Sequence, residues 1–130
     1  MLVLAQLLKS GVPTYRGLPD SIEGKVAYTK AMWAETVAAH LELEETVLWA
    51  EICGRTEKID ALLSELQEEH DQIRYKIDKL SPQTTAAQLD ELGVLLQWHI
   101  RKEERQLFML VQQELTEEEL MHLGELLGAE

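Results

Sequence analysis

Two pairs of metal-binding side-chain types recur in this sequence at the same spacing. His40 precedes Glu44 by four residues within HLELEE, and His99 precedes Glu103 by four residues within HIRKEE. Residues i and i+4 of an α-helix lie on one face, one turn apart, so each pair could approach one ion from one helix. The chain has only four histidines, and two of them follow this pattern. Imidazole and carboxylate without thiolate suit non-heme iron, with manganese or zinc as substitutes.

Long stretches of good helix formers must position these side chains. Short breaks separate them, namely SGVPTYRGLPD, CGRT, LSPQTT and a stop near Leu115. Capping residues precede the stretches at 19–21, at Thr56 and at 81–85, and TEEE from Thr116 is a capping box. We expect helices over 2–9, 20–52, 57–80 and 84–114, and a short helix after Thr116. No alternating run of strand length occurs, so the sequence predicts one domain over 1–130, an all-α up-and-down four-helix bundle.

The remaining question is whether the histidines face the bundle interior. His70 fills the one gap in the apolar 4,3,4,3 spacing of the third helix, and His40–Glu44 and His99–Glu103 replace apolar residues in the same way. The apolar positions around them are Ile59, Leu63, Leu66, Ile73, Ile77 and Leu80; Leu89, Leu92, Leu96, Leu107 and Leu110; and Val26, Trp33, Val37 and Val47. His122 lies off the apolar face of its short helix.

Five buried polar residues on three helices need a partner. An unpaired buried ion costs several kcal/mol, and no lysine or arginine occupies these interior positions. The first interpretation is a metal site whose ligands are His40, Glu44, His70, His99 and Glu103. The second is a buried polar network satisfied by its own hydrogen bonds.

The remaining polar and aromatic candidates receive lesser roles. Glu45 and Glu104 follow the ligand carboxylates and are expected at the rim of the site rather than on the metal. Glu69 and His122 are expected to be solvated. We assign Cys53 no role and no residue a catalytic one. The aromatic residues Trp49, Trp98 and Phe108 are expected to pack near the site.

Composition narrows the partners and the compartment. Lys and Arg total 12 against 24 Asp and Glu, a formal net charge of −12 that disfavours binding to nucleic acid or to anionic membranes. The single cysteine suits a reducing cytosol. The N-terminal MLVLAQLL is short and lacks a basic flank, so it does not read as a signal peptide, and no run reaches the roughly 20 apolar residues that a membrane span needs.

Three motifs in order carry a family resemblance. HLELEETVLW, LQEEHDQI and HIRKEERQLF resemble the successive motifs of the hemerythrin-like, or HHE cation-binding, domain, and the resemblance extends from about residue 2 to the end. It implies a four-helix bundle around a non-heme di-iron centre. By position, the resemblance makes Glu44 and Glu103 the bridging ligands. The terminal ligands would be His40, His70 and His99.

The chain departs from the family pattern at its start. Family members also supply a first-helix histidine just ahead of an apolar stretch resembling LVLAQLL, where this sequence has Met1. Either the natural protein has a short histidine-bearing extension, or this form has an incomplete site. In the second case we expect one iron held firmly and the other loosely or not at all. The uncovered bundle groove would then favour a homodimer.

Two classes of function follow. The leading one is a di-iron protein that binds or senses O2 or a related small ligand, such as NO or peroxide, or that reports iron availability. A redox enzyme on the same centre is its variant, because ligand types alone do not separate binding from turnover. The alternative class is an acidic helical interaction module without a functional metal site. Metal content distinguishes these two classes.

Overall fold

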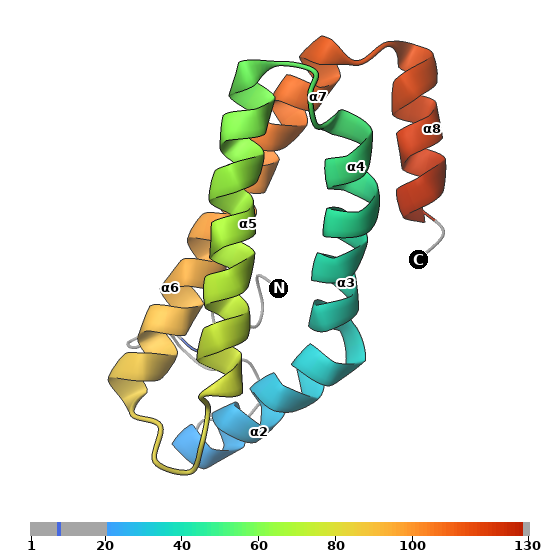
Figure 1. Cartoon of the computed structure of the whole chain (residues 1–130). Helices are drawn as coiled ribbons and strands as arrows, with labels where there is room; N and C mark the ends of the chain where they lie inside the picture. Colours follow the sequence, from blue (N-terminus) through green and yellow to red (C-terminus); the bar gives the residue numbers. More distant parts are fainter. Residues whose placement is uncertain (1–7, 9–20, 129–130) are drawn as a thin grey trace.

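Helices make up all of the regular structure in the computed structural model, which describes Leu8 and residues 21–128 (Figure 1). The all-α class is therefore confirmed. The elements are α2 (Ile22–Met32), η1 (Trp33–Val37), α3 (Ala38–Leu43), η2 (Glu44–Leu48), α4 (Trp49–Ile52), α5 (Glu57–Asp78), α6 (Ala86–Lys102), η3 (Glu103–Leu107), α7 (Phe108–Glu114) and α8 (Glu117–Gly128), where η marks a π-helical turn. None of the described helices is both long and apolar enough to cross a bilayer.

All four described helical stretches begin at the side chains that the sequence indicates. The Ser21 and Thr56 side chains each accept a hydrogen bond from the backbone N–H three residues on, at 3.0 and 3.1 Å. Thr85 opens α6 with a full capping box. Such caps each contribute about 1 kcal/mol, so they fix where the helices start. The expected helix over 2–9 lies outside the described residues except for Leu8.

The fourth stretch, α8, follows the predicted TEEE capping box. The Thr116 N–H donates to the Glu119 carboxylate at 3.1 Å, and the Glu119 N–H donates to the Thr116 hydroxyl at 3.2 Å. The reciprocal pair satisfies two backbone donors that the helix itself leaves free. In Figure 1, α8 returns on the outer side of α3 and α4.

Three π-helical turns interrupt the two longest helices. The Trp49 N–H donates to the Glu44 carbonyl and the Phe108 N–H to the Glu103 carbonyl, each five residues back. Such turns are rare in proteins overall, and those that occur are often located at functional sites. A third, η1, lies where the chain changes direction between α2 and α3 (Figure 1), and an inserted residue of this kind is a known cause of a helix bend.

The π-helical turns shift the buried face by one residue. Beyond them Leu48 and Val111 are buried, whereas the predicted interior positions Val47 and Leu110 are half-buried. The expectation that His40 lies on the buried face is likewise wrong, because its side chain is 44% exposed. The errors at Val47 and Leu110 have a simple cause: the prediction assumed the period of an uninterrupted α-helix. At His40, which precedes η2, the neighbouring Leu41 takes the fully buried position instead.

Two apolar clusters fill the bundle. The first contains Leu8, Val26, Val37, Leu41, Ile73, Ile77, Leu80, Leu89, Leu92 and Leu96. The second contains Leu48, Ile52, Ile59, Leu62, Leu63, Leu66, Leu107, Val111, Leu115 and Leu123. Each long helix passes from one cluster to the other at Glu44, at His70, or at His99 and Glu103. These polar side chains therefore lie between two apolar layers that limit the access of water.

Candidate metal centre

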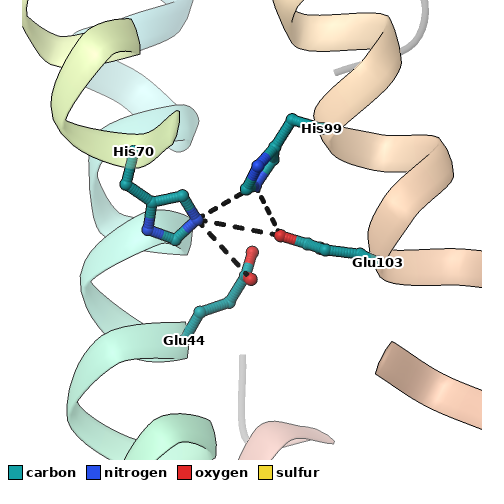
Figure 2. A group of neighbouring side chains, drawn as sticks. All are labelled: Glu44, His70, His99 and Glu103. Atoms are coloured by element: carbon teal, nitrogen blue, oxygen red, sulfur yellow. Dashed lines mark hydrogen bonds and ion pairs between the residues drawn. The ribbon is translucent and has the colours of Figure 1, made fainter. Parts of the chain in front are cut away.

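Four of the five predicted ligands meet at the middle of the bundle. Figure 2 shows Glu44 from η2, His70 from α5, His99 from α6 and Glu103 from η3 pointing toward one another. One nitrogen or oxygen from each lies within 4.8 Å of the others. All four are buried, with His70 and His99 at 0% and 1% exposure. Three helical stretches that are distant in sequence thus supply one polar cluster.

The imidazole Nε2 atoms and the carboxylate oxygens lie close together (Figure 2). His70 Nε2 is 3.0 Å from His99 Nε2, and His99 Nε2 is 2.5 Å from Glu103 Oε1. His70 Nε2 is also 3.7 Å from Glu103 Oε1 and 3.9 Å from Glu44 Oε2. Despite these contacts, both Glu44 oxygens and Glu103 Oε1 are buried without a hydrogen bond of acceptable geometry. These three buried oxygens therefore lack a well-placed hydrogen-bond donor.

The residues present fit a divalent cation. A buried polar atom left without a hydrogen bond costs about 1–3 kcal/mol, and a cation would satisfy several such atoms at once. Two nitrogen ligands about 2.1 Å from one ion and at right angles to each other lie about 3 Å apart, and the Nε2 atoms of His70 and His99 are 3.0 Å apart. The orphaned oxygens favour a metal site over a polar network satisfied by its own hydrogen bonds.

The remaining predicted ligand, His40, lies at the edge of the cluster. Its Nε2 is 2.8 Å from Glu44 Oε1, so it contacts the site through that carboxylate. It is not one of the four residues whose ligand atoms converge. Its role as a ligand stays a prediction. His122 is exposed on α8, in agreement with the sequence-based expectation.

Comparison with known families agrees with this geometry. The model of the hemerythrin HHE cation-binding domain matches residues 8–111. The chain belongs to this family. The matched range contains all five predicted ligands, and the buried cluster of two histidines and two glutamates is compatible with cation binding. No curated protein and no solved structure gave a significant match to the chain. The first-helix histidine typical of hemerythrin HHE domains would lie outside the described residues. The expectation that one iron is held firmly and the other loosely or not at all therefore stays a prediction.

Glu69 has a role in this HHE domain that the sequence did not indicate. The expectation that it is solvated is wrong: Glu69 Oε1 lies 2.9 Å from His99 Nδ1, and its other oxygen pairs with the Lys102 ammonium. Its side chain is 16% exposed. In the sequence Glu69 is next to His70, but in the structure it contacts His99 on a different helix. Only the packing of α5 against α6 brings the two together.

Glu45 lies at the rim of the site, as expected. Arg74 donates to both of its oxygens, at 2.8 and 2.5 Å, and Gln67 donates to Oε1 at 2.9 Å. Glu45 Oε2 is 3.6 Å from His70 Nδ1, beyond hydrogen-bond distance. Glu104, in contrast, is exposed at the surface and is not part of this rim.

Trp49 packs directly on the site, as the sequence suggested. Its ring stacks on His70 at 5.3 Å between centroids and 23° between planes, and its Nε1 donates to Gln67 at 3.1 Å. Trp98 and Phe108 are exposed at 67% and 42%, so the expectation that they pack near the site is not supported. Of the three aromatic residues, Trp49 is the one whose ring stacks on a candidate ligand, His70.

The buried carboxylates have opposite pKa shifts. Burial raises the pKa of Glu44 from 4.5 to about 7, with Glu103 adding to the rise and His40 opposing it. Burial acts in the same direction on Glu103, but its close contacts with the His70 and His99 imidazoles hold its pKa below the usual range. Burial acts to lower the pKa of His99, yet Glu103 and Glu69 raise it overall. Without a cation, Glu44 thus keeps its proton up to a pH of about 7. A bound cation would favour the ionised form of both carboxylates.

Proposed function

We propose that this HHE domain holds non-heme iron and binds or senses O2 or a related small ligand such as NO or peroxide. The observation that carries the proposal is the convergence of two imidazole nitrogens and two carboxylates at the middle of the bundle, all of them buried. Three of the four carboxylate oxygens lack a hydrogen bond of acceptable geometry. The donor set contains no thiolate, which suits iron, with manganese or zinc as substitutes. When bound, iron would supply a redox-active centre able to bind a small ligand.

The chain's own residues have separate tasks in this proposal. His70 and His99 would hold the metal through Nε2, and Glu44 and Glu103 would bridge two ions, with His40 as the ligand on the exposed side. The two apolar clusters lie on either side of the site and would slow the entry of water. The net charge of −12 disfavours nucleic acid and anionic membranes as partners, so the proposed partner is a small molecule.

The experiment is metal analysis of protein purified without a histidine tag, before and after anaerobic loading with Fe(II). We expect stoichiometric iron and new near-ultraviolet and visible absorption that changes on exposure to O2 or NO. Glu103→Gln should lose the iron. Glu104→Gln is the matched control, because it makes the same change at the exposed neighbouring position.

Two results would contradict the proposal. Wild-type protein that binds no iron and melts identically with and without chelator would favour the acidic interaction module. Firm binding of zinc, with no iron retained under anaerobic loading, would contradict the redox role. Catalytic consumption of peroxide by the iron form would favour the enzyme variant over a sensor.

A further inference from the structure

The two central histidines differ in what holds the far side of the ring. His99 Nδ1 lies 2.9 Å from Glu69 Oε1, a carboxylate that Lys102 in turn holds. His70 Nδ1 is buried without a hydrogen-bond partner. The nearest recorded carboxylate, Glu45, is 3.6 Å away. The Nε2 atoms of both rings nevertheless point at the same cluster.

Resting on the proposed metal site, we propose that Glu69, held by Lys102, is a positioning residue that fixes His99 with Nδ1 protonated and Nε2 directed to the metal. His99 is then the firmer of the two imidazole ligands.

The first step of the argument is the tautomer. A histidine that binds metal through Nε2 must carry its proton on Nδ1, and a carboxylate accepts that proton's hydrogen bond. The partner also stops the ring from rotating and makes Nε2 a stronger donor. Glu69 is suitably placed for this task, since its side chain is only 16% exposed and comes from the facing helix.

The second step is the place of Lys102. Partial burial of a carboxylate costs desolvation free energy unless a cationic side chain compensates its charge. Lys102 pairs with Glu69 and, at 3.6 Å, with Glu65. It lies three residues after His99 on the same helical stretch, so the cation and the imidazole contact Glu69 from one side of α6. Lys102 thus holds the Glu69 carboxylate in place against the His99 ring.

The third step is the contrast with His70. Arg74 and Gln67 together provide three hydrogen bonds to Glu45, which hold this carboxylate away from the His70 ring. Trp49 stacks on the ring instead. Stacking restricts the plane of the imidazole but does not choose between its tautomers. The two ligands are therefore positioned by different means, and removal of Glu69 should affect only His99.

The experiment measures Co(II) affinity by competition with a coloured chelator, together with the visible Co(II) spectrum. The variants are Glu69→Ala, Glu69→Gln and the control Glu68→Gln, which removes one charge from the exposed neighbouring position of α5. Loss of such an outer partner typically weakens metal affinity 10- to 100-fold. We expect this loss and a changed spectrum for Glu69→Ala. Glu69→Gln should show a smaller loss, because its amide oxygen can still accept from Nδ1–H, and Glu68→Gln should match wild type.

A second measurement addresses the tautomer itself. In the Zn(II)-loaded protein, the Nδ1 proton of His99 should give a slowly exchanging downfield NMR signal that Glu69→Ala loses. If wild type binds Co(II) but Glu69→Ala and Glu69→Gln bind within threefold of it and keep the proton signal, the positioning role is wrong and the metal site stands. If wild type binds no Co(II), the proposed metal function fails, and this role with it. Should Glu69→Ala not fold, Glu69→Gln and the proton signal still decide the question.

Discussion

The substitution Glu44→Gln should have opposite effects on the metal-free and the metal-bound protein. Glu44 is buried, and both of its oxygens lack a hydrogen bond of acceptable geometry. In the metal-free protein its ionised form is costly, so an uncharged amide of nearly the same shape should stabilise the fold at alkaline pH. In the presence of metal the same change removes a ligand, so the stabilisation that metal binding provides should be lost.

The size of the first effect follows from the pKa of Glu44. Burial raises this pKa from 4.5 to about 7, so the folded protein keeps a proton between these pH values that the unfolded chain has released. Stability therefore falls as the pH rises through this window, and the full cost is present above pH 7. At about 1.4 kcal/mol per pH unit, Glu44→Gln should stabilise the metal-free protein by about 3 kcal/mol at pH 8 and by less than about 1 kcal/mol at pH 5.

The assay is urea denaturation at pH 5 and pH 8, with EDTA and again with excess Zn(II). Glu42→Gln is the control, since this exposed carboxylate lies two residues away on the same helix and its neutralisation should change stability by less than about 0.5 kcal/mol. The reasoning would be refuted if Glu44→Gln destabilised the metal-free protein at pH 8, or if its effect did not change between pH 5 and pH 8.

Three further outcomes are expected. His70→Ala and His99→Ala should each lower Co(II) affinity by at least about 100-fold in the chelator competition, whereas His122→Ala on the exposed face of α8 should leave it unchanged. Arg74→Gln should cost about 0.5–1 kcal/mol at pH 7 after allowance for solvent screening. Because Arg74 lowers the pKa of Glu45 to about 2, the contribution is complete above pH 4.5 and is lost as the pH falls toward 2, so urea denaturation of this variant should converge on wild type in acid. Leu66→Ala, at a fully buried position beside His70, should cost about 2–5 kcal/mol; a loss below about 1 kcal/mol in urea denaturation would show that this layer is loosely packed.

Periodicity alone located most of the site. The apolar spacing around His70 and the i, i+4 pairs predicted that polar side chains would lie inside the bundle, and three helical stretches indeed bring four of them together. This succeeds because a buried polar residue interrupts a pattern that otherwise follows from helix geometry. The helix N-caps at Ser21, Thr56 and Thr85 could also be predicted, because each depends only on residues within one helical turn.

The π-helical turns could not be predicted from this spacing. Their extra residue is not visible in composition, yet it moves the buried face from Val47 to Leu48 and from Leu110 to Val111. Glu44 and Glu103 each begin such a turn. Between His40 and Glu44 and between His99 and Glu103 the chain is α-helical, so the i, i+4 pairs were found. The errors at Val47 and Leu110 follow the start of each turn, whereas His40 lies at the edge of the buried face.

The contacts of the carboxylates near the ligands could not be predicted for a different reason. Glu69 was expected to be solvated, and Glu45 was expected at the rim but without its partners. Glu69 contacts His99 and Glu45 approaches His70, and each pair joins two different helices. The one-dimensional pattern shows which residues share a helix face, but it does not show how far one helix is displaced along the next. That displacement determines which ion pairs form: Lys102 pairs with Glu69, and Arg74 pairs with Glu45. The net result is that each imidazole has an acidic side chain near Nδ1 whose charge is balanced by a base at the surface. Within the buried cluster, Glu44 and Glu103 are the carboxylates for which no lysine or arginine partner is found among the described residues, and a cation would bind there.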